Sequence, residues 1–398
     1  MGIGRLWAVI GVTFLAQAHT TYVHIFIHGT TVPGLLLLSQ KEKPEGSRLG
    51  EQFVSLVEKS RNDERFYDDS IMLEPGLVPV SSLLINQCRA QQLDSYQSRK
   101  AAVQAITAYD DLINNHKDYY YYFTYGWSGL LSDDCRKKES EKLYKELVVL
   151  RTKIQERTGQ VPQFILHAHS HGGGLVLYIA LQEEINKQGL SIEQVFLYET
   201  PIQIETAQYC LNSCFKNMVL FYSEGDTVQI ADCISTKGKS CRTFSELVSL
   251  EQARNRIHEI LVKCGGDSTV LRHRAYFIFD AYHENLSALY RIVLGKNEAI
   301  DFLNPLPFVI LSPIVMNLLQ SVPPRKKHAT QCELDVQVGP CSCNLQLMVL
   351  NQCQRCSPNV WQAISDIKKR VAATWAPYAK TSDVKKIFWL GQHLITRS

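Results

Sequence analysis

The sequence predicts an α/β fold with a mostly parallel central sheet flanked by helices, on three observations. Short apolar runs rich in β-branched and aromatic residues recur along the chain, as expected of strands that are buried on both faces of a sheet. Segments with apolar residues at helical spacing lie between several of these runs. Most runs also end in a short cluster of glycine and polar residues. Strands that alternate with helices imply right-handed βαβ units and therefore a parallel sheet.

Six runs are predicted to be strands because they are short, apolar and nearly free of charge. They cover residues 22–27, 118–125, 164–166, 194–198, 217–222 and 274–279. Helical spacing predicts helices over residues 101–114 and 139–157, from the glycines after Ser170 to about residue 187, and after His283 to residue 294.

The composition limits the class of protein. A chain of 398 residues can hold one large α/β domain with an appendage. The net charge of +3 is too small to indicate a nucleic-acid partner. Twelve cysteines, an even number, favour an oxidising compartment over the reduced cytosol.

The first 18 residues resemble a signal peptide. Arg5 carries the only charged side chain, residues 6–18 are largely apolar, and Ala16-Gln17-Ala18 provides the small-x-small pattern that signal peptidase accepts. The apolar stretch is too short to span a bilayer comfortably. We therefore expect cleavage after Ala18 and a secreted or periplasmic protein; the alternative is a buried first strand or helix.

The chain changes character after residue 296, so we expect a catalytic domain over residues 19–296 and a C-terminal appendage over residues 297–398. Residues 302–319 are apolar but broken by Pro305, Pro307 and Pro313. The prolines count against a membrane span and favour a hydrophobic hairpin over the core, or a lid beside a lipid site that makes peripheral membrane contact.

Five cysteines then follow within a short stretch. They are Cys332, Cys341, Cys343, Cys353 and Cys356. The C-x-C and C-x-x-C pairs are compatible with a zinc site, but the predicted secretory route favours disulfides.

Ser170 is the candidate nucleophile. An apolar run over residues 164–166 leads to it, three glycines (172–174) follow it, and a helical pattern begins there. A serine on a sharp turn between a strand and a helix has its hydroxyl displayed at the end of the sheet. Ala168 replaces the first glycine of the G-x-S-x-G pattern, which is the smallest available enlargement.

A serine nucleophile needs a base, and an acid that orients the base. Asp226 is the candidate acid, because it follows the predicted strand 217–222 within a Gly-Asp turn. Glu199, directly after the strand that precedes it, is the alternative acid. Both belong to the carboxyl ends of strands, where open α/β sheets place their sites.

His283 is the candidate base, because it follows the last predicted strand and opens a helix. His273 precedes that strand, and His258 lies in a helical pattern, so both are expected to be structural. The chain order Ser170, Asp226, His283 is the order in which α/β-hydrolases carry their triad.

The backbone N–H groups of Thr30 and His171 are the candidate oxyanion donors. Thr30 follows the first strand in His28-Gly29-Thr30, and His171 follows the nucleophile. We assign His169, beside the nucleophile, and Trp127, just after the second strand, to substrate contact.

A metal site is the alternative interpretation of the same stretch. His167, His169 and His171 alternate, and on an extended strand they would share one face. The turn at Ser170 breaks that geometry, so we expect no metal and no cofactor.

These motifs resemble the α/β-hydrolase superfamily, in particular its lipases and esterases, over roughly residues 20–296. The matching segments are His28-Gly29-Thr30, His169-Ser170-His171-Gly172-Gly173, Gly225-Asp226 and His283. The resemblance implies a serine hydrolase that cleaves carboxylic esters of small molecules or lipids through an acyl-enzyme. The alternatives are a thioesterase or peptidase on the same fold, and a non-catalytic binding or effector protein that retains the scaffold.

Overall fold

The computed structural model describes the larger part of the chain. The described residues are 19–29, 75–90, 101–113, 117–129, 132–226, 229, 238, 240–253, 256–264, 266, 308–320, 331–338, 343–349, 352–355, 362, 364–367 and 369.

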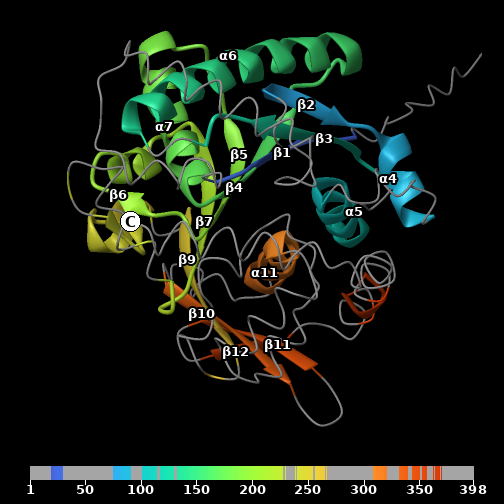
Figure 1. The fold of residues 1–398 in the computed structure, drawn as a ribbon, viewed down its shortest axis with the longest axis vertical. Helices are drawn as coiled ribbons and strands as arrows, with labels where there is room; N and C mark the ends of the chain where they lie inside the picture. Colours follow the sequence, from blue (N-terminus) through green and yellow to red (C-terminus); the bar gives the residue numbers. More distant parts are fainter. Residues whose placement is uncertain are drawn as a thin grey trace, which may run out of the picture.

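A single ten-stranded sheet forms the centre of the described fold (Figure 1). In spatial order its strands are β12 (Gln352–Arg355), β11 (Cys343–Val349), β10 (Gln331–Val338), β9 (Ile257–Cys264), β7 (Phe215–Tyr222), β5 (Ile192–Tyr198), β4 (Gln163–His169), β1 (Thr21–Ile27), β3 (Tyr119–Gly126) and β2 (Gly76–Val80). All neighbours from β10 to β3 pair in parallel. Antiparallel pairing occurs only at the two ends of this described sheet, at β2 and at β11 and β12. The predicted mostly parallel α/β architecture is confirmed.

Five of the predicted strands are confirmed as β1, β3, β4, β5 and β7, with ends that differ by a few residues. The predicted strand over residues 274–279 lies outside the described residues. The assignment of His258 to a helical pattern was wrong, because the segment Ile257–Cys264 forms β9 and pairs in parallel with β7.

Helices cover both faces of the sheet (Figure 1). One face carries α6 (Asp133–Thr158) and α7 (His171–Asn186); the other carries α5 (Ala101–Ile113) and α11 (Leu311–Gln320), with α4 (Ser82–Arg89) against α5. The predicted helices in these regions are confirmed. Helix α6 begins earlier than predicted because the Ser132 hydroxyl accepts a hydrogen bond from the Cys135 N–H at 3.4 Å, which caps the helix.

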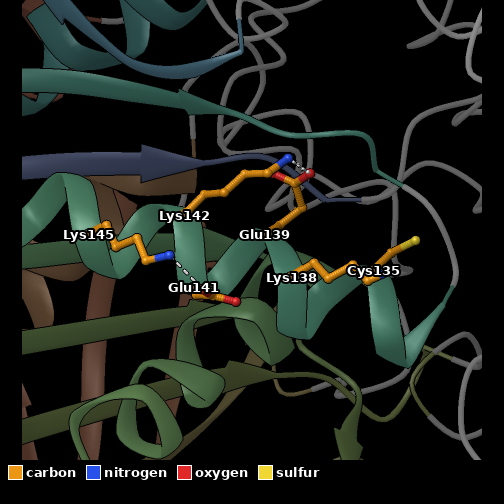
Figure 2. Close-up of a pocket in the computed structure, with 6 residues that line it drawn as sticks. All are labelled: Cys135, Lys138, Glu139, Glu141, Lys142 and Lys145. Carbon is orange, nitrogen blue, oxygen red and sulfur yellow. Dashed lines mark hydrogen bonds and ion pairs between the residues drawn. The ribbon is translucent and has the colours of Figure 1, made fainter. Parts of the chain in front are cut away.

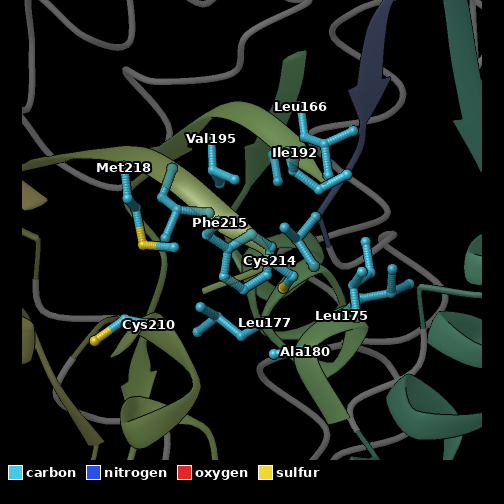
Figure 3. Packing of buried hydrophobic residues seen from close by; sticks show 14 of the residues in the cluster. Leu166, Leu175, Leu177, Ala180, Ile192, Val195, Cys210, Cys214, Phe215 and Met218 are labelled. Carbon is cyan, nitrogen blue, oxygen red and sulfur yellow. The ribbon is translucent and has the colours of Figure 1, made fainter. Parts of the chain in front are cut away.

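Alternate residues of each central strand enter different cores. Val23 and Ile25 of β1 pack toward α6 and α7, whereas Phe26 packs toward α5 and α11. Figure 3 shows the first of these cores, in which Val195 and Met218 of the sheet meet Leu177 of α7. Burial on both faces explains why these strands read as continuous apolar runs.

The apolar segment after residue 302 packs on the core in its described part. Val315 and Leu318 of α11 are buried in the cluster that also contains Ile106 of α5. This arrangement favours the expected cover over the core. Among the helices of the described segments, none combines the length and the apolar character needed to cross a bilayer.

The strands after residue 330 extend the central sheet, because β10 lies parallel to β9 with Cys332 opposite Ile260. Cys332 is a buried free thiol in this structure, and burial raises its pKa to about 12. The side chains of the other four cysteines in this region lie outside the described part of the structure, so their predicted pairing stays a prediction.

Candidate active site

Three of the predicted site residues converge at the carboxyl ends of adjacent strands. Ser170 follows β4, Glu199 follows β5 and Asp226 lies shortly after β7. These strands are neighbours in the sheet, and Gly29 follows β1 on the other side of β4. The parallel sheet therefore brings the candidate nucleophile and both candidate acids to one edge.

Ser170 occupies a strained turn. Its backbone has φ 50° and ψ −130°, a combination that residues other than glycine rarely adopt. Its N–H donates to the Tyr198 carbonyl at 2.9 Å, and its own carbonyl accepts from the Gly173 N–H at 2.9 Å. Ser170 thus makes the last backbone hydrogen bond between this chain segment and β5, and it also accepts the first backbone hydrogen bond from α7. At 2% exposure it lies below the surface, as a reacting group shielded from water would.

The glycines after Ser170 allow the start of α7 to pack closely against the residues that follow β1 and β5. A Cβ atom on Gly172 would lie 2.4 Å from the His28 carbonyl oxygen, and one on Gly173 would lie 2.1 Å from the Thr200 Oγ1. Neither position has room for a side chain. Gly174 is less confined, since its nearest neighbour would lie 3.4 Å away on Arg136. Two of the three glycines are therefore required by close packing.

The end of β1 lies directly against the nucleophile turn. A Cβ atom on Gly29 would lie 2.7 Å from the Ser170 Cβ and 2.9 Å from the His169 Nδ1. This contact places the predicted oxyanion segment beside Ser170 up to Gly29. Thr30, the predicted donor, is outside the described residues.

His28 and Trp127 hold the end of β1 in place. The Trp127 backbone N–H donates to the His28 Nε2 at 3.2 Å, and the Trp127 indole Nε1 donates to the His28 carbonyl at 2.8 Å. Because the His28 Nε2 accepts, its Nδ1 carries the proton and donates to the Gly29 carbonyl at 2.7 Å. The two rings also stack, with centroids 5.7 Å apart. The sequence did not predict that the His28 side chain holds Trp127 and the Gly29 carbonyl.

Trp127 is 1% exposed, and its hydrogen bonds go to His28. Its predicted contact with substrate stays a prediction, as does that of His169, which is buried over Gly29. His171, the second predicted oxyanion residue, begins α7 and is buried as well.

Glu199 and Asp226 are both completely buried, at 0% exposure. The Glu199 N–H donates to the Phe221 carbonyl of β7 at 2.9 Å. The Asp226 Oδ1 accepts from the Gln229 N–H at 3.3 Å. Burial raises the pKa of Glu199 well above its usual range, and the negative charge of Asp226 raises it further. Burial and the neighbouring charge thus both favour the protonated form of the Glu199 carboxyl group.

Gln229 joins the two acid-bearing loops. Its side-chain amide Nε2 donates to the Thr200 carbonyl at 3.0 Å, while its backbone N–H serves Asp226. The Gln229 carbonyl in turn accepts from the Ser240 hydroxyl at 2.8 Å. A single glutamine between Val228 and Ile230 carries no sequence signal, which is why this residue was missed.

Three buried polar rings from neighbouring strands contact one another in a row: His24 of β1, His167 of β4 and Tyr198 of β5. The His24 Nδ1 lies 3.3 Å from the His167 Nε2, and the His167 Nδ1 lies 3.2 Å from the Tyr198 hydroxyl. His167 stacks on Phe26 with ring centroids 4.5 Å apart. Burial lowers the pKa of His24 to about 3 and that of His167 well below its usual value. Both imidazoles are neutral parts of the core.

The alternative metal site finds no support among the described side chains. No three histidine, cysteine, aspartate or glutamate residues of the described segments are grouped so that they could hold a metal ion. His167 takes part in the row of buried rings, and His171 belongs to a helix.

The predicted base, His283, lies outside the described residues, as does His273. The strand next to β7 is β9, which ends at Cys264, so both histidines come after a strand of the sheet in the sequence.

A shallow pocket on α6 is separate from this constellation (Figure 2). It is lined by Cys135, Lys138, Glu139, Glu141, Lys142 and Lys145. Lys142 pairs with Glu139 at 2.9 Å and Lys145 with Glu141 at 2.6 Å, as on a solvated helix face. None of these residues belongs to the strand-end site.

A comparison with protein-family models matches no family, and a search of curated proteins finds no significant match.

Proposed function

We propose that this protein is a serine hydrolase of the α/β-hydrolase type that cleaves carboxylic esters. The observation that carries the proposal is the geometry of Ser170. It occupies a strained strand-to-helix turn (φ 50°, ψ −130°) with the end of β1 against it on one side. On the other side, the buried residues Glu199 and Asp226 follow the next two strands of the sheet, β5 and β7. A non-glycine residue in such a conformation is a frequent mark of a functional site.

In the proposed reaction the Ser170 hydroxyl attacks the ester carbonyl while His283 takes its proton. Asp226 holds the imidazole in the required orientation. The N–H groups of Thr30 and His171 stabilise the oxyanion, each contributing about 3 to 4 kcal/mol to the lowering of the barrier. The imidazolium then protonates the leaving alcohol, and water releases the acid from the acyl-enzyme. The reaction needs no cofactor.

His273 is a second candidate for the base. From the sequence, His273 is expected to be structural because it precedes the predicted strand 274–279. With β9 next to β7, His273 is the first histidine that follows this part of the sheet in the sequence. The two histidines are therefore both to be tested.

The substrate is the least constrained part of the proposal. The apolar segment that suggested a lipid ester is buried in the core in its described part, so its composition has a structural explanation. A lipid or small-molecule ester, peripheral membrane contact, removal of residues 1–18 and secretion remain proposals. A thioesterase, a peptidase or a non-catalytic scaffold are the alternatives.

A fluorophosphonate probe tests the proposal, because it labels a serine only when a base and an oxyanion hole activate it. We expect labelling of the wild-type protein, and none of Ser170→Ala. His283→Ala and His273→Ala should differ, with the true base losing labelling at least 100-fold. His258→Ala is the matched control, since His258 lies within β9. Folded wild-type protein that stays unlabelled contradicts the proposal. A series of p-nitrophenyl esters then defines the acyl chain.

A further inference from the structure

We propose that Ser240 and Arg242 are positioning residues for Asp226, because they hold the chain on both sides of it. Both belong to residues 240–246, which we call the support segment. The role of Asp226 as the acid that orients the base rests on the proposed function, whereas the contacts that hold the chain do not. The support segment fixes the carboxylate and takes no part in the chemistry itself.

The support segment contacts the chain before and after Asp226. The Arg242 Nη2 donates to the Glu224 carbonyl at 2.9 Å, which lies before Asp226 in the sequence. The Ser240 hydroxyl donates to the Gln229 carbonyl at 2.8 Å, which lies after it. The Gln229 N–H in turn donates to the Asp226 Oδ1 at 3.3 Å. The residue that Ser240 holds is therefore itself bonded to the carboxylate.

Asp226 needs such contacts because it stands beyond the end of its strand. Strand β7 ends at Tyr222, and its pairing with β9 ends at the same residue. Asp226 is nonetheless completely buried. A carboxylate that orients an imidazole must be held to within about 0.5 Å of the productive geometry. Contacts outside the pairing of the strands must therefore supply that precision.

The support segment is itself anchored to the sheet. The Ser245 hydroxyl and N–H donate to the Glu259 carboxylate at 2.7 Å and 3.0 Å. Glu259 is completely buried on β9, where it lies opposite Leu220 of β7. At its other end the support segment begins with β8 (Ser240–Cys241), which pairs with β6 (Ile202–Gln203), the strand that follows β5 in the chain. Since β5 and β9 flank β7, the support segment is tied to the elements on both sides of that strand.

A capping box fixes the backbone from which the Arg242 side chain extends. The Glu246 Oε1 accepts from the Arg242 N–H at 3.1 Å, from the Thr243 N–H at 3.0 Å and from the Thr243 hydroxyl at 2.9 Å. These bonds cap the short helix η3 (Phe244–Glu246). The guanidinium therefore reaches the Glu224 carbonyl from a defined backbone position.

The kinetics of p-nitrophenyl ester hydrolysis test the positioning role. Arg242→Met removes the guanidinium donors, and Ser240→Ala removes one hydroxyl. We expect each variant to lower kcat about tenfold with KM within about twofold of the wild type, because the carboxylate is misplaced while the substrate site is intact. Arg256→Met is the matched control, since the Arg256 guanidinium donates to the carbonyls of Leu211 and Phe215 at the amino end of β7, at 3.0 Å and 2.7 Å. An unchanged kcat in both test variants overturns the proposal, as does an equal loss in the control.

Combination with Asp226→Asn separates positioning from a general loss of stability. If Arg242 acts through the carboxylate, Arg242→Met should slow fluorophosphonate labelling of Ser170 about tenfold in the wild type but less than about twofold in the Asp226→Asn background. Equal losses in the two backgrounds overturn the proposal. Full labelling of Asp226→Asn overturns it as well, because the acid is then another residue.

Hydrogen exchange tests the support of Asp226 without relying on catalysis. The Gln229 amide should exchange about tenfold faster in Arg242→Met and in Ser240→Ala than in the wild type, because its bond to Asp226 is no longer held in place. Exchange that is unchanged in both variants overturns the proposal. If exchange accelerates while the folded wild type is not labelled by the fluorophosphonate, the proposed function fails and the support of Asp226 by these two residues stands.

Discussion

Ser170 and Glu199 follow register partners on adjacent strands, and both have left-handed backbones, with φ 50° and φ 48°. The Ser170 N–H donates to the Tyr198 carbonyl and the Glu199 N–H donates to the Phe221 carbonyl, both at 2.9 Å. The hydrogen bonding of the sheet therefore continues into the two residues that turn away from it. Each such turn costs about 1 kcal/mol or more for a residue with a Cβ atom, and the surrounding structure must supply that free energy.

Ser170→Gly should be more stable than Ser170→Ala by about 1 kcal/mol. Both variants lack the hydroxyl, but glycine adopts φ 50° without the steric cost that alanine retains. Urea unfolding measures the difference, and both variants should lack labelling by the fluorophosphonate. Equal stability would mean that the turn carries no backbone strain.

Gly173→Ala should destabilise the fold by about 2 to 4 kcal/mol, because its Cβ would lie 2.1 Å from the Thr200 Oγ1. Gly174→Ala is the matched control one residue further along α7, where the nearest atom would lie 3.4 Å away. It should be neutral or slightly stabilising, since alanine favours helix over glycine. Adding Thr200→Ala to Gly173→Ala should restore part of the loss, which thermal unfolding of the four proteins can show. An equal effect of the two glycine variants would contradict the packing argument.

The protein should lose stability in acid through His24 and His167. Burial lowers the pKa of His24 from its ordinary value of 6.5 to about 3, so between these pH values the unfolded chain binds a proton that the folded chain does not. The contribution of His24 is therefore complete above pH 6.5 and falls by about 1.4 kcal/mol for each pH unit below it, down toward pH 3. His167, whose pKa is also lowered by burial, adds to this slope. Unfolding in urea at pH 7 and pH 5 measures the slope.

His24→Phe keeps an aromatic ring at this position and should reduce that slope. His19→Gln is the matched control, because it removes an imidazole at an exposed position outside the buried contact of His24 with His167. A slope that is unchanged in His24→Phe would assign the acid sensitivity to other groups.

Trp127→Phe should lower kcat/KM for an ester substrate about tenfold with little change in KM. The variant retains a ring over His28 but loses the indole donor to the His28 carbonyl, so the strand end beside Ser170 is held less firmly. Tyr125→Phe, near the end of β3, is the matched control, because its hydroxyl donates to Glu139 on α6, at 3.0 Å to the carbonyl and 3.5 Å to the carboxylate. A rise in KM alone for Trp127→Phe would instead support its predicted contact with substrate.

The sequence predicted the centre of the sheet well because those strands are buried on both faces. Residues 22–27 of β1 and 218–222 of β7 carry no charged side chain, and only His24 interrupts their apolar and aromatic sequence, a pattern that fits few other structures. The segment Ile257–Cys264 lacks this uninterrupted apolar pattern and was therefore not predicted to be a strand. Its apolar residues Ile257, Ile260 and Leu261 follow helical spacing, and Glu259 interrupts the run.

Tertiary contacts decide that ambiguity in favour of a strand. The Glu259 carboxylate accepts from the Ser245 hydroxyl at 2.7 Å and from the Ser245 N–H at 3.0 Å, so the buried charge has partners that a local pattern does not reveal. Strand pairing with β7 and β10 then holds the segment extended.

At the candidate site, the sequence predicted the residues that stand at the ends of strands, namely Ser170, Asp226 and Glu199. It did not predict that burial and the neighbouring Asp226 charge raise the pKa of Glu199, because both effects depend on the tertiary fold. It also missed Gln229 and the side chain of His28, whose contacts join segments far apart in the chain.

The strand β1 has a consequence for the order in which the chain assembles. Its partners are β3 (Tyr119–Gly126) and β4 (Gln163–His169), so about 140 residues of sequence separate β1 from one of its two neighbours. During synthesis this apolar strand leaves the ribosome long before either partner exists. Its pairing with β4, and with it the contact between Gly29 and the Ser170 turn, forms only after this length of chain has been made. The step that joins β1 to the later strands of the sheet is therefore also the step that brings Ser170 to its place.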